Sequence, residues 1–292
     1  MLGELACLAA ALLWALSVFL FRPAIARWGA QMINLAKGVV ATIMLALTVT
    51  LLGSWPTLLD GSGVELGLLA ASGLVGITLG DTALFAAVVR IGVHRSLLLL
   101  TLAPVFTAAL ARAMVDERLT TLQLTGGIGV LVGVILVVLP ERRAAAQPLA
   151  RAGIALGLLA AFGQGAGVVL AKSGMATIPA IPATLLRLAA ASLGLILVFA
   201  VRRDLGRTWA CVRHWPTMRR VVPTALVGTF VAMTLMMVGI ALAPASVAAV
   251  LLATTPVFSL FLEWGVDGKR PTVLSTAGTT LAVLGVALLG AA

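Results

Sequence analysis

The chain has 292 residues, of which 61% are hydrophobic and only 10% are charged, and its mean hydropathy is +1.16. Soluble globular proteins have roughly a quarter of their residues charged, so this composition excludes a soluble domain and indicates a polytopic membrane protein. The net charge of +10 does not indicate nucleic-acid binding, because the basic residues lie in short gaps between apolar runs rather than on one contiguous face.

The apolar runs predict helical membrane spans. A helix needs about 20 apolar residues to cross a bilayer, and only helices and closed barrels can do so. The runs are too long and too uniform for barrel strands. We therefore predict ten transmembrane helices, at 3–21, 33–52, 66–89, 96–115, 122–139, 153–171, 183–201, 221–242, 246–266 and 273–289.

Two stretches of the chain resemble one another. Residues 104–137 align without a gap on residues 256–289, and 11 of the 34 positions are identical. In the same way, an offset of 150 residues places Lys37 on Arg187 and extends the duplication to the earlier spans. Five spans per copy is an odd number, so the second copy must enter the membrane the other way up. We predict an all-α integral membrane protein whose repeats, 1–145 and 146–292, form one inverted-repeat domain around a central cavity.

The charges of the connections predict an orientation. Connections after the odd-numbered spans are basic, and those after the even-numbered spans are mostly acidic or neutral. By the positive-inside rule, the odd-numbered connections are cytoplasmic and both termini lie outside the bacterial inner membrane. The basic residues after odd-numbered spans are Arg22, Arg27, Arg90, Arg95, Arg142, Arg143, Arg151, Arg202, Arg203, Arg207, Arg213, Arg219, Arg220, Lys269 and Arg270.

Several of these motifs together resemble a known family. The Pro-Val-Phe of Pro104 to Phe106, the turn at 116–119, the glycine-rich helix after it and the Ala-Leu-Leu-Trp ending at Trp14 look like the EamA-type transporters of the drug/metabolite transporter superfamily. The resemblance implies ten helices around a central cavity and a secondary transporter of small molecules, in a family whose cargo includes amino acids, drugs and sugars, often exported.

The chain departs from the family pattern in three places. The second repeat has Gly268, Lys269 and Arg270 where the first has Asp116, Glu117 and Arg118. Gln164 occupies the position that Trp14 has in the first repeat. The loop charges place the termini outside, whereas such transporters usually have cytoplasmic termini.

Ionisable residues inside spans are costly and suggest function. Lys37 and Arg187 occupy equivalent places in the two repeats and are candidates to bind a carboxylate-bearing substrate in succession, although basic side chains this near a span's start can also snorkel. Asp81 lies about five residues, roughly 7 Å, deeper than Lys37. The two are predicted to form an ion pair, either permanent or broken by substrate or by a proton.

Four further residues complete the candidate site. Trp14 and Gln164 are expected to line the cavity, because the resemblance places the first helix of each repeat there. Pro104 and Pro256 each remove a backbone hydrogen bond and are candidate gating kinks, or alternatively static ones.

Missing motifs narrow the function. The sequence has no phosphate-binding P-loop, no metal-ligand cluster and no nucleophile motif, so we expect neither an enzyme nor a bound cofactor or metal. We predict a secondary transporter that exports amino acids or similar small metabolites by alternating access, with proton coupling open and a monomer or weak homodimer as the assembly. The alternative is a flippase for lipid headgroups or other amphiphiles; a membrane enzyme or assembly factor is disfavoured.

Overall fold

The computed structural model describes residues 2–115, 120–144, 148–242, 251–252, 254–268 and 270–290, and every regular element in them is helical. The first repeat contains α1 (Leu2–Trp28), α2 (Ala30–Leu51), α3 (Trp55–Leu59), α4 (Gly63–Ser72), η1 (Gly73–Asp81), α5 (Thr82–Ile91), α6 (Val93–Leu100), α7 (Ala103–Val115) and α8 (Thr121–Ala144). The second contains α9 (Pro148–Gly174), α10 (Ala180–Val201), α11 (Leu205–Arg213), α12 (Trp215–Ala225), η2 (Leu226–Val231), α13 (Ala232–Leu242), α15 (Thr255–Asp267) and α16 (Val273–Gly290).

The helices are long and apolar enough for a membrane protein. Within the described residues, five can cross a bilayer by length and composition: Leu2–Trp28, Ala30–Leu51, Gly63–Ile91, Arg151–Ala171 and Ala180–Val201. Three shorter apolar helices, Val93–Thr107, Thr125–Leu136 and Val273–Leu288, fall on further predicted spans. The two remaining predicted spans correspond to the run from α12 to α13 and to α15. The predicted all-helical fold of two five-span repeats is confirmed.

Some predicted boundaries were wrong. Arg22 and Arg27 were assigned to a connection, but α1 continues through them to Trp28. The helix continues because Ile25, which lies beyond the predicted end at Phe21, is buried in the core. His94 was likewise assigned to a loop, yet it lies in the first turn of α6, separated from α5 by Gly92 alone. Gly92 has φ of 85°, a value that glycine adopts without strain, so a single residue reverses the chain.

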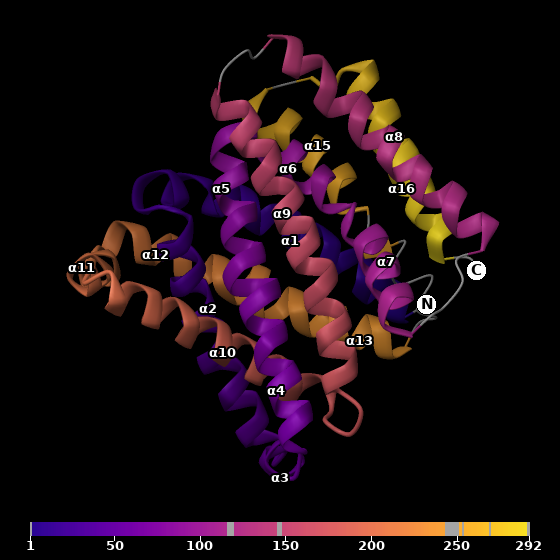
Figure 1. Ribbon diagram of the computed structural model, residues 1–292. Coiled ribbons are helices and arrows are strands. Elements are labelled where there is room, and N and C mark those ends of the chain that lie inside the picture. Colours follow the sequence, from indigo (N-terminus) through magenta and orange to yellow (C-terminus); the bar gives the residue numbers. More distant parts are fainter. Residues whose placement is uncertain are drawn as a thin grey trace.

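The two sets of connections lie at opposite ends of the helices. In Figure 1 the turns that follow α1, α5 and α10 lie toward the top and left, whereas α3, the turn between α9 and α10 and both marked chain ends lie toward the bottom and right. This separation agrees with the predicted alternation of the spans. Which end faces the cytoplasm stays a prediction from the loop charges.

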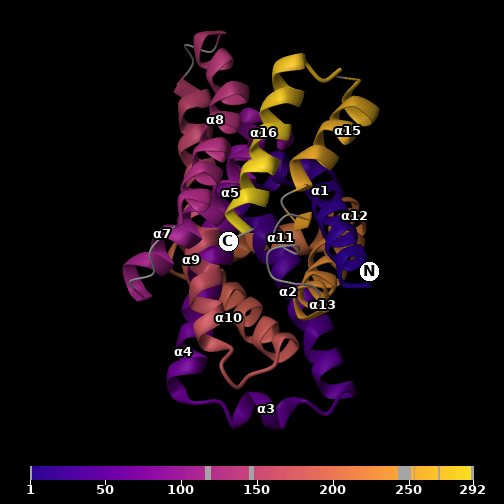
Figure 2. The same ribbon diagram turned by 90° about the vertical axis from the view of Figure 1, so that its right-hand side faces the viewer.

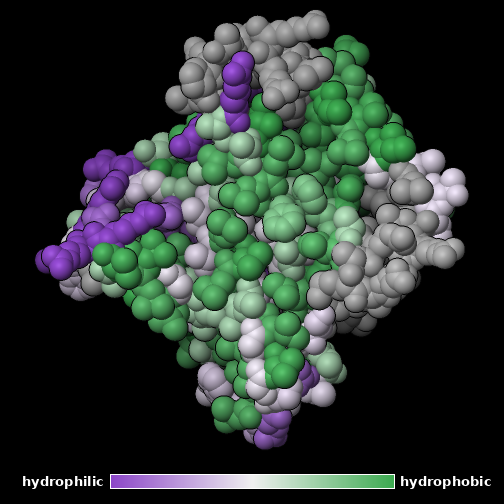
Figure 3. Space-filling model, in the orientation of Figure 1, coloured by the Kyte–Doolittle hydropathy of each residue, from purple (hydrophilic) through white to green (hydrophobic). Residues whose placement is uncertain are grey.

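Much of the helix packing joins one repeat to the other. α1 packs on α13, α2 on α10, α8 on α16, and α9 on both η1 and α5, so each of these contacts joins one repeat to the other. Figures 1 and 2 both show α8 alongside α16. Large apolar side chains cover much of the outer surface (Figure 3), and on α2 they recur at helical spacing as Ile43, Leu47 and Leu51. Such surfaces suit contact with lipid chains.

Each repeat has a π-helical segment in its third span. η1 ends at Asp81 and η2 ends at Val231, which are equivalent under the 150-residue offset that relates Lys37 to Arg187. A π-helical turn redirects the side chains that follow it and often occurs at functional sites. In the first repeat this segment delivers an acid to the protein interior, whereas the second repeat has a valine at that position.

Candidate functional site

A buried ion pair lies at the centre of the candidate site. Lys37 Nζ on α2 is 2.5 Å from Asp81 Oδ2 at the end of η1, and the two side chains are only 7% and 6% exposed. The predicted contact between Lys37 and Asp81 is therefore present. Lys37 Nζ also lies 5.2 Å from the centre of the Phe85 ring, a second favourable partner for its charge. Whether the pair opens during transport stays a prediction.

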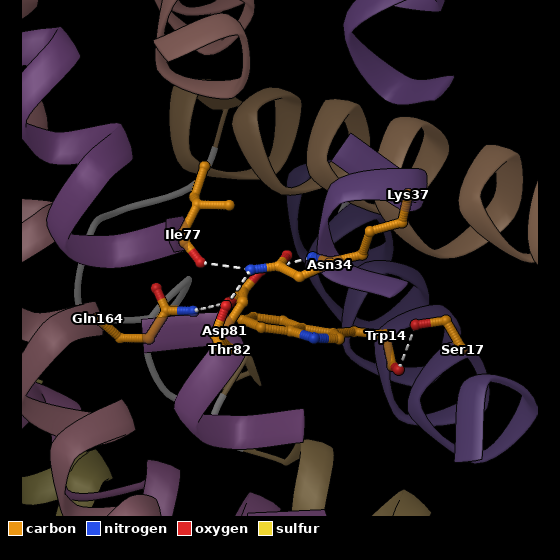
Figure 4. A network of polar contacts seen from close by, with 8 residues as sticks. All are labelled: Trp14, Ser17, Asn34, Lys37, Ile77, Asp81, Thr82 and Gln164. Atoms are coloured by element: carbon orange, nitrogen blue, oxygen red, sulfur yellow. Dashed lines mark hydrogen bonds and ion pairs between the residues drawn. The ribbon is translucent and has the colours of Figure 1, made fainter. Parts of the chain in front are cut away.

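The second repeat completes the coordination of Asp81. Gln164 on α9 donates from Nε2 to Asp81 Oδ1 at 2.9 Å, so each carboxylate oxygen has its own partner (Figure 4). Close helix packing makes this contact possible. A Cβ added to Gly163 would lie 3.1 Å from Gly80 Cα, and one added to Gly167 would lie 2.8 Å from Gly76 Cα. The glycines beside Gln164 thus bring α9 and η1 together, and none of the sequence reasoning had paired Gln164 with Asp81.

Asn34 is a site residue that the sequence analysis missed. Its side-chain amide donates to Ile77 O at 2.8 Å and to Thr82 Oγ1 at 2.9 Å, and so fixes the backbone around Asp81. Its buried Oδ1 has no hydrogen-bond partner in the described part of the chain. Asn34 lies three residues before Lys37 on α2, and this helical spacing was the available signal.

Arg187 has a different environment from Lys37, although the two residues are equivalent in sequence. It is 6% exposed on α10, and its buried Nε has no hydrogen-bond partner among the described residues. A Cβ added to Gly76 would lie 3.8 Å from Arg187 Nη2, so the guanidinium lies against η1, with the charge of Asp81 acting on it through space. Lys37 is thus paired with the acid, whereas the Nε donor of Arg187 is unused within the described part of the chain.

Trp14 borders the polar cluster. Its half-buried side chain packs on the core formed by α1, α2 and α5, and Figure 4 shows the indole beside Asp81 and Thr82. Ser17 Oγ donates to Trp14 O at 2.8 Å within the same helix. Trp14, Gln164, Asp81 and Lys37 are therefore brought together, and their role in binding substrate stays a prediction.

The two candidate gating prolines lie at the starts of helices in spans four and nine. Pro104 is in the first turn of α7, after a break at Thr101 and Leu102, and Pro256 is in the first turn of α15. A threonine hydroxyl donates to a backbone carbonyl just before each proline. Thr101 Oγ1 donates to Leu98 O at 2.7 Å, and Thr255 Oγ1 donates to Leu252 O at 2.7 Å. Both prolines thus begin helices, and in the described part of the chain neither takes part in the hydrogen bonds of Lys37 and Asp81.

The glycines of spans five and ten pack the repeats together. A Cβ on Gly133 would lie 2.5 Å from Gly278 O, and one on Gly285 would lie 2.6 Å from Gly126 O. Small-residue faces of this kind allow close helix contact, either within one chain or between subunits. In the structure they join α8 to α16 within one chain.

A second polar cluster joins the repeats near the odd-numbered connections. His94 Nδ1 lies 3.2 Å from Pro256 O and 3.0 Å from Ser259 Oγ, and Nε2 lies 3.0 Å from Ser275 Oγ. The backbone N–H of His94 donates to Glu263 Oε1 at 3.1 Å. Arg22 forms a bidentate pair with Asp267 at 2.6 and 2.7 Å. The sequence analysis gave His94 no role because it placed the residue in a loop.

Some predicted features lie outside the described residues. These are the turn at 116–118 and Lys269. Among the described residues, no group of three or more His, Cys, Asp or Glu side chains could hold a metal ion.

Comparison with known proteins agrees with this architecture. The sequence profile of the EamA-like transporter family matches residues 1–139 and again 151–291. A solved structure described as "Crystal structure of protein" has a TM-score of 0.69 to this chain, covers 98% of it and 96% of its own length, and is 15% identical, which shows a shared fold. No curated protein matches the sequence. Because the family profile accounts for both repeats, the chain belongs to the EamA-like transporter family and is a multi-pass membrane transporter of the drug/metabolite transporter type.

Proposed function

We propose that this transporter exports amino acids or similar small metabolites across the bacterial inner membrane by alternating access. The polar cluster supports a substrate site between the repeats, because Lys37 and Asp81 come from the first repeat and Gln164 and Arg187 from the second. A site built from both halves changes its exposure when the halves rock against one another.

The observation that carries the proposal is the buried Arg187 guanidinium, whose Nε has no hydrogen-bond partner among the described residues. A buried donor on a cation without a partner is unfavourable, and a planar guanidinium matches a carboxylate with two parallel hydrogen bonds. The second repeat supplies no acid for it, since Val231 is the equivalent of Asp81. A substrate carboxylate is therefore the proposed counterion of Arg187.

Asp81 complements the other charge of an amino acid. A substrate ammonium group can compete with Lys37 for Asp81, which makes the ion pair a reversible element of the cycle rather than a permanent brace. In the same way, a proton on Asp81 would release Lys37. In this proposal the cycle alternates between an intact Lys37–Asp81 pair and a pair opened by substrate or by a proton.

Purified protein in liposomes tests the transported class. Internal unlabelled amino acid is expected to drive counterflow of external labelled amino acid. The same vesicles, prepared with a headgroup-labelled lipid, test the flippase alternative. Movement of the lipid between leaflets without amino-acid counterflow would refute the proposed solute transport.

Proton coupling needs its own variant. Asp81→Asn is expected to abolish the pH dependence of transport, because Asp81 is the proposed titrating group inside the membrane. Asp60→Asn is the matched control, since Asp60 is an exposed acid in the connection after α3. Undiminished, still pH-dependent transport by Asp81→Asn would refute the coupling role.

A further inference from the structure

The connection between α10 and η2 carries an unusual concentration of exposed positive charge. Six arginines are exposed there, against the single acid Asp204 within the same stretch. They form the most hydrophilic patch at the left of Figure 3, over α11 and the start of α12. We call residues 202–220 the arginine connection. Its arginines are Arg202, Arg203, Arg207, Arg213, Arg219 and Arg220.

The arginine connection is also rich in exposed aromatic and apolar side chains. Cys211 is buried and holds α11 against the protein, whereas Trp209 is 63% and Trp215 is 71% exposed. Arg213 lies over the Trp209 ring, with its guanidinium carbon 6.0 Å from the ring centre. The outer face of α11 therefore combines an indole ring and a cation, the two groups that favour the boundary between headgroups and acyl chains.

The rest of the connection is anchored to the transporter. Arg202 Nη1 donates to Gln31 Oε1 at 3.0 Å, and Trp28 Nε1 donates to Thr217 Oγ1 at 2.9 Å. His214 caps the start of α12 by accepting from the Thr217 N–H at 3.3 Å. These contacts fix the arginine connection to the turn between α1 and α2, so its charges form a surface of defined position.

The equivalent connection of the first repeat provides an internal comparison. The 150-residue offset places residues 52–70 on the arginine connection, and α3 there also exposes apolar side chains, Trp55 and Leu59. That stretch contains no lysine or arginine, and its charged residues are Asp60 and Glu65. The two repeats therefore share an interfacial helix, and only one has gained positive charge.

We propose that the arginine connection binds the headgroups of anionic phospholipids in the adjacent leaflet. The argument rests on charge complementarity, exposed indoles at the membrane boundary and the absence of such charge from the equivalent connection at the opposite end of the helices. Clusters of four to eight basic residues beside a membrane helix attract anionic lipid. This proposal is independent of the transported substrate.

Lipid titration of the purified full-length protein in neutral detergent tests the proposal. Native mass spectrometry would measure binding of phosphatidylglycerol and, separately, of phosphatidylcholine. The wild type is expected to bind phosphatidylglycerol preferentially. The triple variant R207Q/R213Q/R219Q should lose affinity by on the order of a hundredfold, at about fivefold for each arginine near an anionic surface.

A matched triple variant controls for general charge. R90Q/R151Q/R270Q removes three exposed arginines associated with the other odd-numbered connections and is expected to change phosphatidylglycerol affinity by less than about threefold, because its positions lie outside the proposed surface. Equal losses in the two triple variants would overturn the assignment to the arginine connection. Equal binding of both lipids by the wild type, or displacement of phosphatidylglycerol by millimolar inorganic phosphate, would overturn headgroup recognition. Thermal unfolding of each variant in neutral detergent would verify that it is folded.

Discussion

The Lys37–Asp81 pair offers a quantitative test of the site. Both side chains are more than nine-tenths buried, and Arg187 adds a further positive charge nearby. Asp81→Asn keeps the shape of the side chain but leaves Lys37 buried without its counterion. Breaking a buried pair in this way costs about 3–5 kcal/mol, whereas replacing both partners with neutral groups can be close to neutral. We therefore expect Asp81→Asn to be more harmful than the double variant K37M/D81N.

Thermal unfolding of four proteins in the same detergent measures this interaction. At about 2–4 °C for each kcal/mol, Asp81→Asn is expected to lower the apparent Tm by roughly 6–20 °C. Lys37→Met should also be destabilising, and K37M/D81N should recover at least half of the larger loss. The interaction energy from the cycle is then on the order of 3 kcal/mol. Additive effects of the two single substitutions would show that the pair has no energetic coupling and would refute the reasoning.

Two further predictions concern the packing between repeats and the native cysteines. Gly133→Ala should destabilise the protein by about 1–3 kcal/mol, because its methyl group would lie 2.5 Å from Gly278 O. To reach ordinary contact at 3.4 Å, α8 would have to move by about 0.9 Å. Gly127→Ala, which meets nothing within 4 Å, is the control and should leave the apparent Tm unchanged or slightly higher; equal losses in both variants would contradict close packing of α8 on α16. Burial raises the pKa of the Cys211 thiol, with Arg207 opposing the shift more weakly, so less thiolate is present at pH 7 than for an ordinary cysteine. A maleimide should therefore label Cys211 only after denaturation, and rapid labelling of the folded protein at pH 7 would contradict its buried position.

Much of the site followed from depth along the helices. Counting residues from a shared end placed Lys37 and Asp81 within reach of each other, and the structure has them in contact. The depth of a residue in the membrane can be estimated from the helical rise and the order of the spans alone. The estimate therefore does not require the packing of neighbouring helices to be known.

Contacts between the repeats required information that the sequence does not contain. The partnership of Gln164 with Asp81 depends on how closely α9 approaches η1, and this distance is set by glycines from both repeats. The π-helical form of η1 has no distinctive sequence pattern, so the direction of Asp81 was not predictable. The contrast between Lys37, which is paired, and Arg187, whose Nε has no partner among the residues that the structure describes, was hidden because sequence symmetry treats the two cations alike.

The predicted helix boundaries were wrong where the chain reverses direction at a single residue. Arg90 and Arg95 give residues 90–95 the polar character of a loop, so His94 was taken for a loop residue, whereas Gly92 alone separates α5 from α6. Its buried contacts with Pro256 and Ser275 come from the other repeat and appear only in three dimensions.

The central claim, that Arg187 holds a substrate carboxylate, is tested most directly by varying the residue and the ligand together. Once counterflow has identified a transported amino acid, its affinity and that of its decarboxylated amine would be measured for the wild type and Arg187→Gln, with Arg187→Lys as the charge-conserving variant. We predict that Arg187→Gln weakens binding of the amino acid at least tenfold and leaves binding of the amine nearly unchanged, with Arg187→Lys intermediate because a lysine keeps the charge but loses the bidentate geometry. Equal weakening of both ligands by Arg187→Gln would contradict the claim.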